Sequence, residues 1–255
     1  MVASPRRTSC DAHRGVAVRL LAIDTSTEQV AVAIGSDGVV SAAIKLRGER
    51  RHAEQLVPAI RYVADETGTD LSHLAAIAVC IGPGLFTGLR VGVTTAKVMA
   101  QALHVPVIPV GSLDLVAFPL RHSPRLIVAA LDARRGELFH ASYRSLPGGV
   151  QRVTDDTVSS PEDLVADLVT RDEPVLLAGD GAIRYRELFA QLEHADHAGQ
   201  AFVAPSIDAL VELASARLER EDYIGPAELV PRYLRASDAE LDHRERVVNV
   251  MNSAS

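Results

Sequence analysis

The 255-residue chain contains no tryptophan, five tyrosines, five phenylalanines, two lysines and two cysteines. Two cysteines cannot build a disulfide framework, and Cys80 lies in an apolar run that predicts a buried strand. No apolar run reaches the roughly 18 residues that a membrane-spanning helix needs. Residues 1–15 carry arginines without the hydrophobic segment of a signal peptide. We therefore expect a cytoplasmic protein that does not bind membranes.

Basic charge is also scarce, because 33 acidic side chains outnumber 26 basic ones and the formal net charge is −7. This balance argues against a nucleic-acid-binding protein with a broad basic surface of its own. The nine histidines include no pair four residues apart, and no H-E-x-x-H motif occurs. The G-x-S-x-G elbow of serine hydrolases is missing too. We expect no metal site and no catalytic residues.

Hydrophobic periodicity divides the chain into two α/β halves. The first half predicts three strands, a helix, a strand, a helix, a strand and a helix, with the opening strands joined as antiparallel neighbours. That order differs from a Rossmann βαβαβ repeat and matches one actin-like or sugar-kinase-like domain. The runs "LLAIDTST" and "VAALDARR" each end an apolar strand with aspartate, which indicates two halves of related design. The prediction is an α/β protein with the two-lobe actin-like/sugar-kinase fold (ASKHA, ribonuclease H-like) and mixed sheets.

The predicted organisation has four segments. They are a disordered extension over residues 1–17, a first lobe over 18–121, a second lobe over 122–236 and a flexible tail over 237–255. In the first lobe the apolar pattern and the turn residues predict two helices, at about residues 53–67 and 89–103.

The stretch "IGPGLFTGLRVG", from Ile81 to Gly92, joins an apolar strand to the second of these helices. Glycines permit positive φ angles or close backbone approach, and free N–H groups at a helix start attract anions. The spacing fits neither the Walker A loop nor the dinucleotide-binding fingerprint. A phosphate-binding turn and a tight connection that packs the helix against the sheet are therefore both open interpretations.

Two aspartates occupy corresponding strand ends in the two halves. In actin-like ATPases such carboxylates face each other across a cleft and hold a metal-bound phosphate. The second loop here is "DARRGE", with arginines where a glycine-rich phosphate turn would be expected. The sequence thus predicts a vestigial nucleotide cleft, and the alternative is that these residues simply terminate strands. The candidate cleft residues are Asp24, Thr25, Ser26, Asp132, Gly179 and Gly181.

Several motifs occur in an order and at a spacing that resemble the TsaB (YeaZ) family. They are "LLAIDTST", "HAEQLVPAI", "IGPGLFTGLRVGVTTAKVMAQAL", "VPVIPVGSLDLVA" and "ALDARRGELF", and the resemblance is strong over residues 19–139. It implies a non-catalytic scaffold subunit of the complex that forms N6-threonylcarbamoyladenosine at position 37 of tRNAs reading ANN codons. The paralogue TsaD carries the transfer chemistry and binds metal through paired histidines, which this chain lacks. At one position the chain departs from the family, because Leu85 replaces the usual serine of "GPGSFTG".

The resemblance also implies partners. They are TsaD, the ATPase TsaE, a second copy of the chain when it is alone, and tRNA only indirectly through the complex. No tightly bound cofactor is expected, and ATP or ADP with Mg²⁺ would bind only in the complex. The expected partner-binding residues lie on the two helices of the first lobe: Leu56, Ile60, Val63, Val91, Thr95, Met99 and Ala102.

Two other functions are open from the residues alone. The chain could be a self-sufficient actin-like ATPase or small-molecule kinase that uses Asp24 and Asp132. It could also be a metallopeptidase, although the missing histidine pairs argue against this class.

Overall fold

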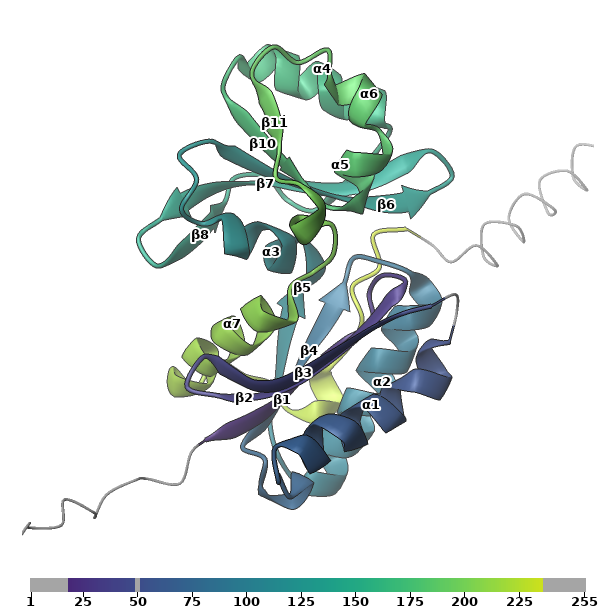
Figure 1. Ribbon diagram of the computed structural model, residues 1–255, viewed down its shortest axis with the longest axis vertical. Helices are drawn as coiled ribbons and strands as arrows, with labels where there is room; N and C mark the ends of the chain where they lie inside the picture. The colour runs from purple at the N-terminus through teal and green to yellow at the C-terminus, as the bar shows by residue number, and fades with distance from the viewer. Residues whose placement is uncertain (1–17, 49–50, 236–255) are drawn as a thin grey trace, which may run out of the picture.

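The computed structural model describes residues 18–48 and 51–235, which form two α/β lobes stacked along the long axis of the molecule (Figure 1). The expectations for residues 1–17 and 237–255 lie outside the described residues. Among the described residues, no helix combines the length and the apolar character that crossing a membrane requires.

The first lobe is built on a five-stranded sheet in the order β3-β2-β1-β4-β5. The first three strands are antiparallel neighbours, and β4 and β5 then add in parallel to β1. The central β1 is an unbroken apolar run because both of its faces are covered, whereas the edge strand β3 alternates between exposed and half-buried residues. These strands are β1 (Arg19–Asp24), β2 (Gln29–Ser36), β3 (Val39–Arg47), β4 (Ala76–Gly82) and β5 (Val107–Gly111).

Helices cover both faces of this sheet (Figure 1). On one face α1 (His52–Glu66) and α2 (Phe86–Leu103) lie side by side and enclose the larger apolar core of the lobe. On the other face α7 (Ile207–Glu219) packs against the alanine-rich side of the same strands. The helices predicted at about residues 53–67 and 89–103 are both present, and α2 begins at Phe86, one turn before the predicted start.

The second lobe repeats the design of the first. Its main sheet has the order β8-β7-β6-β10-β11, and the short β9 pairs with β7. Position by position, this order corresponds to β3-β2-β1-β4-β5 of the first sheet. Its strands are β6 (Leu126–Arg134), β7 (Glu137–Leu146), β8 (Gly149–Arg152), β9 (Thr157–Ser159), β10 (Val175–Ala178) and β11 (Ala195–His197). One face carries α4 (Pro161–Arg171), α5 (Asp180–Arg184) and α6 (Arg186–Phe189). The repeated strand order confirms the two-lobe actin-like fold class.

Two helices pack against the sheet of the lobe other than the one that precedes them in the sequence. The short α3 (Ser112–Ala117) follows β5 but packs against the second sheet, and α7 follows the second lobe but packs against the first sheet. The predicted boundary after residue 121 does fall between the strands of the two sheets. It assigns α7 to the wrong lobe, however, because Ile207, Leu210 and Val211 are buried against the first sheet. The chain therefore crosses between the lobes more than once.

Candidate functional site

The glycine turn packs the start of α2 against the loop that follows β1. A Cβ atom at Gly84 would lie 2.2 Å from the Ser26 carbonyl oxygen, and one at Gly88 would lie 2.1 Å from that of Thr25. Such contacts are impossible for any other residue, so these positions require glycine. The Leu85 N–H donates to the Ser26 carbonyl at 2.8 Å, and the Thr25 hydroxyl donates to the Gly88 carbonyl at 2.8 Å. The turn therefore acts as a tight strand-to-helix connection.

The close packing buries the first candidate nucleotide loop. Asp24 and Thr25 are fully buried and Ser26 is 1% exposed. The Ser26 N–H donates to Asp24 Oδ1 at 2.9 Å. Burial raises the pKa of Asp24, and hydrogen bonds from Ser26 oppose this shift only in part. A fully buried carboxyl with a raised pKa is poorly suited to hold a solvated metal ion, so this part of the predicted cleft is not accessible.

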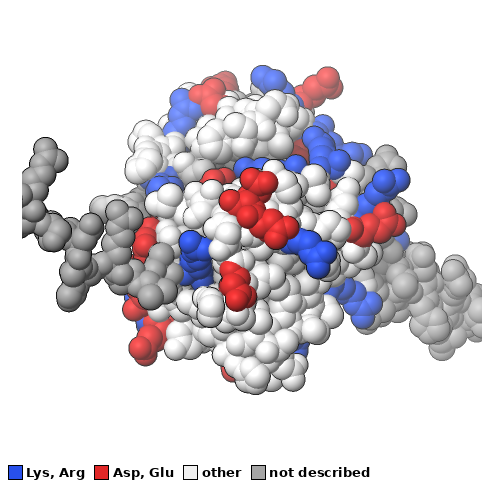
Figure 2. All heavy atoms as spheres, turned by 60° about the horizontal axis from the view of Figure 1, so that its bottom comes forward, with Lys and Arg blue, Asp and Glu red and all other residues white. Residues whose placement is uncertain are grey.

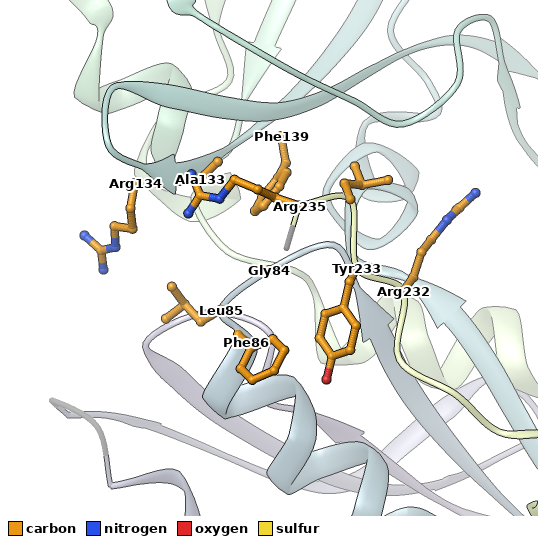
Figure 3. Close-up of a pocket in the computed structure, with 10 residues that line it drawn as sticks. Gly84, Leu85, Phe86, Ala133, Arg134, Phe139, Arg232, Tyr233 and Arg235 are labelled. Carbon is orange, nitrogen blue, oxygen red and sulfur yellow. The ribbon is translucent and has the colours of Figure 1, made fainter. Parts of the chain in front are cut away.

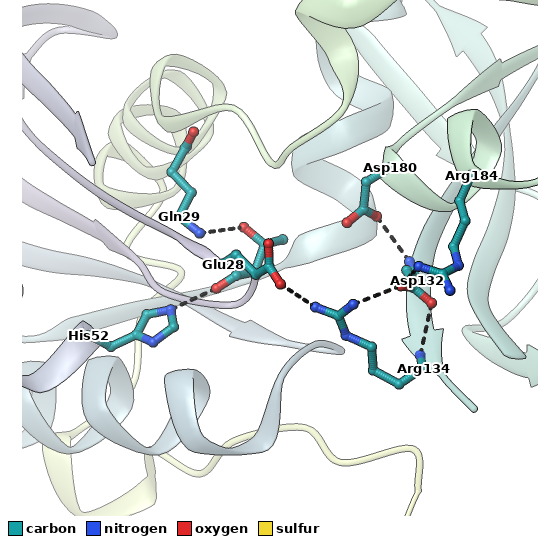
Figure 4. A network of polar contacts seen from close by, with 8 residues as sticks. Glu28, Gln29, His52, Asp132, Arg134, Asp180 and Arg184 are labelled. Atoms are coloured by element: carbon teal, nitrogen blue, oxygen red, sulfur yellow. Dashed lines mark hydrogen bonds and ion pairs between the residues drawn. The ribbon is translucent and has the colours of Figure 1, made fainter. Parts of the chain in front are cut away.

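The second candidate carboxylate is also engaged, and its partners are arginines (Figure 4). Asp132 Oδ2 lies 3.2 Å from Arg134 Nη1 and 3.5 Å from Arg184 Nη1. The Asp132 N–H donates to Asp180 Oδ1 at 2.9 Å. Burial raises the pKa of Asp180, and the nearby charge of Asp132 adds to the shift. Arg134 also reaches across to Glu28 of the first lobe at 2.5 Å. The Asp132 carboxylate is thus already paired with two arginines, one of which connects it to the first lobe.

The glycines of the "GDG" turn also face the protein interior. A Cβ atom at Gly179 would lie 2.0 Å from the Ala130 carbonyl oxygen, and one at Gly181 would lie 2.5 Å from a methyl group of Leu138. Both glycines are buried. Their small size lets α5 pack against β6, and neither glycine lines the two recesses between the lobes, so a role in a nucleotide cleft stays a prediction.

The space between the lobes is small in this conformation. One recess of about 10 Å³ is lined by residues that include Ser26, Leu85, Asp132 and Asp180, which is room for about one water molecule. A second recess of about 80 Å³ lies between the glycine turn and residues 232–235 (Figure 3). Small-molecule sites usually measure about 300–1,000 Å³. Over residues 18–48 and 51–235, no group of three or more histidine, cysteine, aspartate or glutamate side chains could hold a metal ion.

The expected partner residues on α1 require a correction. Leu56, Ile60 and Val63 are 1%, 4% and 0% exposed and belong to the apolar core beneath the sheet. Their spacing identifies the buried face of α1, because an amphipathic helix packs its most apolar stripe against the core of its own lobe. The outer face carries Val57, which is 62% exposed.

On α2 the expected partner residues are divided. Val91 and Met99 are half-buried and pack against the core, and Thr95 is also half-buried. Ala102 is exposed. The outermost residues of this helix include Thr94 and Val98, which the sequence analysis did not single out.

A shallow groove of about 710 Å³ runs between α1 and α2. We call its exposed lining the α1–α2 face, which consists of Val57, Arg61, Asp65, Asp70, Thr94 and Val98. Val57 and Val98 are 62% and 59% exposed. Figure 2 views the molecule from the lower end of the first lobe, and most of the surface on that side is uncharged with only scattered charged groups. An apolar groove with a charged rim fits a protein partner.

Two residues near the candidate cleft were missed as site residues. His52 is 5% exposed, and its Nε2 lies 2.7 Å from the Thr27 carbonyl oxygen, which ties the start of α1 to the loop after β1 (Figure 4). Arg134 joins Glu28 and Asp132 across the lobes. The contacts of His52 with Thr27 and of Arg134 with Glu28 join residues far apart in sequence. The only feature of the sequence that could have indicated the second contact is the pair of arginines in "DARRGE".

Comparison with known proteins agrees with this architecture. Residues 40–243 match a family model described as "TsaD: tRNA N6-adenosine threonylcarbamoyltransferase". The tRNA threonylcarbamoyladenosine biosynthesis protein TsaB of Bacillus subtilis is 32% identical over 227 residues, which cover 87% of this chain and 96% of that protein. The structure of YeaZ from Pseudomonas aeruginosa superposes with a TM-score of 0.70 at 30% identity, and the match covers 85% of this chain and 99% of YeaZ.

The similarity to a transferase is more limited. A tRNA N6-adenosine threonylcarbamoyltransferase of Trichlorobacter lovleyi is 36% identical over 111 residues, which cover 37% of this chain and 32% of that enzyme. The TsaB and YeaZ matches, in contrast, extend over nearly the whole length of those proteins. The chain therefore belongs to the TsaB (YeaZ) family.

Proposed function

We propose that this protein is a non-catalytic scaffold subunit of the cytoplasmic complex that forms N6-threonylcarbamoyladenosine at position 37 of tRNAs reading ANN codons. It binds and supports a catalytic TsaD subunit through the α1–α2 face. The observation that carries the proposal is the groove between α1 and α2, where two valines lie largely exposed on adjacent helices. Family membership and the match to a TsaD family model support it.

The closed cleft supports the non-catalytic part of the proposal. Asp24 is fully buried, and Asp132 is paired with two arginines. A carboxylate that must bind a magnesium–phosphate group needs free oxygen atoms directed at the ligand. The self-sufficient ATPase alternative therefore lacks accessible ligands in this conformation. It predicts that the isolated chain turns over ATP with Mg²⁺ and that Asp24→Ala abolishes the turnover.

Charge and composition support a protein partner rather than direct tRNA binding. The chain has a formal net charge of −7, and the α1–α2 face contains one arginine and two aspartates among apolar and hydroxyl side chains. We propose that tRNA contacts come mainly from the rest of the complex, and that TsaE joins the same assembly. ATP or ADP with Mg²⁺ would bind in the complex. In the absence of TsaD, the same face would pair two copies of the chain.

The test is light-scattering chromatography of this chain mixed with TsaD from the same organism at tens of micromolar. The wild type is expected to form a one-to-one complex. Val98→Glu places a charge in the groove and should weaken the complex by tenfold or more. Val169→Glu is a matched control, because Val169 on α4 is also 59% exposed but lies on the second lobe.

Two results would contradict the proposal. One is a wild-type chain that forms no complex with TsaD, with and without nucleotide. The other is an equal effect of the two valine substitutions. A parallel assay of N6-threonylcarbamoyladenosine formation on a tRNA transcript should require this chain and should lose activity with Val98→Glu.

A further inference from the structure

The segment from Leu229 to Arg235 runs along the first lobe and then enters the space between the lobes (Figure 3). It follows a short turn, Pro226–Glu228, that lies against α2. The segment has no regular secondary structure, so its side chains and a few backbone contacts must hold it in place. We call residues 229–235 the C-terminal strap.

The strap is attached to the first lobe at three points. Leu229 is 1% exposed and belongs to the core beneath α1 and α2. Lys97 of α2 donates from Nζ to the carbonyl oxygens of Ala227 and Leu229 at 3.0 and 3.1 Å. The Arg232 N–H donates to the Ile81 carbonyl at 2.7 Å, where β4 enters the glycine turn. These contacts position the strap beside the start of α2.

Further along, the strap contacts the first turn of α2 through an aromatic pair. The ring of Tyr233 lies 4.7 Å from that of Phe86 between centroids, at an interplanar angle of 34° (Figure 3). Phe86 is the first residue of α2, directly after the glycine turn. Aromatic pairs at such distances attract each other beyond the area that they bury. The strap is therefore bound to α2 at its first residue, Phe86, and in its C-terminal half, through Lys97.

The last residues of the strap reach the second lobe. Arg232 Nη1 lies 2.6 Å from Asp156 Oδ2, and the side chain of Asp156 is only 1% exposed. Arg152 of β8 pairs with the same carboxylate. Leu234 packs against the core between α3 and the second sheet. Arg235 Nη1 donates to Glu137 Oε2 of β7 at 2.6 Å.

The geometry points to a conformational device: the C-terminal strap fixes the angle between the two lobes and ties α2 to the second lobe, with Arg232 and Leu234 as its anchors. Arg232 pairs with a buried carboxylate of the second lobe, and Leu234 packs against an apolar core of that lobe. A segment held by the core of one lobe and by both anchors on the other resists opening of the cleft. Loss of both anchors removes the contact with the buried carboxylate and the apolar contact, while the ion pair of Arg235 with Glu137 remains.

The device is tested by measuring the distance between the lobes in the full chain. Spin labels are placed at Val39→Cys on β3 and Val169→Cys on α4, which are 68% and 59% exposed, in a Cys10→Ser background. Cys80 is buried and unlabelled. The double variant Arg232→Ala/Leu234→Ala is compared with Val230→Ala, a control on the same strap whose side chain is 64% exposed. Hydrogen exchange of the Arg232 amide, which donates to the Ile81 carbonyl, reports whether the strap remains on the first lobe.

The wild type and the Val230→Ala control are expected to give one narrow distance distribution. The double variant should broaden or shift it, while exchange of the Arg232 amide should stay within about twofold of wild type, because its bond to the Ile81 carbonyl lies on the first lobe. An unchanged distance distribution in the folded double variant overturns the inference. If the double variant does not fold, the single variant Arg232→Gln is measured instead. It removes one anchor, at a half-exposed side chain, and must broaden or shift the distance distribution to a smaller extent.

Discussion

Arg134 of the second lobe lies between Glu28 of the first lobe, at 2.5 Å from Nη2 to Oε1, and Asp132 of its own lobe, at 3.2 Å from Nη1 to Oδ2. The guanidinium therefore bridges the two loops that would face a bound nucleotide in an actin-like ATPase (Figure 4). A cation that belongs to the protein thus lies between Glu28 and Asp132. This contact accounts for Arg134 of the "DARRGE" loop.

The bridge between the lobes should contribute little to stability. The side chains of Arg134 and Glu28 are 44% and 47% exposed, and water and salt screen pairs of this kind. A double-mutant cycle with Arg134→Ala and Glu28→Ala, followed by urea unfolding, should give a coupling free energy of about 0.2–1 kcal/mol. Arg144→Ala, whose pair with Glu173 lies within the second lobe, is the control. A coupling free energy above about 2 kcal/mol would contradict this view of the bridge.

Gly84 should not tolerate a side chain. The added Cβ of Gly84→Ala would meet the Ser26 carbonyl oxygen at 2.2 Å, so the start of α2 or the loop after β1 must shift. We expect the free energy of unfolding to fall by about 1–3 kcal/mol or more, as for other overpacked sites. Gly149→Ala is the control, since its Cβ would make only an ordinary contact with Phe118 at 3.9 Å. Equal stability of the two variants in urea unfolding would rule out the close-packing role.

Ionisation of Asp24 should lower the free energy of unfolding as the pH rises. Burial raises its pKa in the folded protein above the ordinary value of 3.8, so the unfolded chain releases the proton first. Its contribution to stability is fully present below about pH 4 and is lost as the pH rises through the folded-state pKa. Asp24→Asn cannot ionise, so its stability relative to wild type should increase with pH over that window.

Asp70 offers a control of opposite sign for this experiment. Hydrogen bonds from Ser72 lower the pKa of the exposed Asp70 carboxyl. Its contribution is therefore present above the ordinary value and is lost as the pH falls through the folded-state pKa. In thermal unfolding, Asp24→Asn should gain stability relative to wild type as the pH rises above about 4, whereas Asp70→Asn should gain stability relative to wild type only as the pH falls below about 4. A flat difference for Asp24→Asn would show that the carboxyl is ionised in the folded protein.

Substitutions at two adjacent residues of α1 should distinguish the buried core of the first lobe from the proposed partner surface. Leu56 is 1% exposed, so Leu56→Ala leaves a cavity and should lower the free energy of unfolding by about 2–5 kcal/mol. Val57 is 62% exposed, so Val57→Ala should change stability by less than about 0.5 kcal/mol. Urea unfolding checks both values, and TsaD binding should weaken with Val57→Ala. Binding that depends on Leu56 in a variant of unchanged stability would restore the original assignment.

The sequence by itself determined the strand and helix order of the first lobe, the relation between the two halves and the family. These features depend on local periodicity, turn residues and the quoted motifs, which can be read without knowing what each face contacts. The apolar spacing of Leu56, Ile60 and Val63 correctly indicated a helix. It could not indicate a partner, because the same spacing is required to bury a helix against its own sheet.

Only the tertiary structure decided which helices belong to which lobe and whether the cleft is open. The packing of α7 on the first sheet, the burial of Asp24 under the glycine turn and the bridge from Arg134 to Glu28 all join residues distant in sequence. The short edge strand β11 is another case, since its pairing with β10 supplies its backbone hydrogen bonds. Such contacts depend on the free energy of the assembled fold, and no local pattern specifies them.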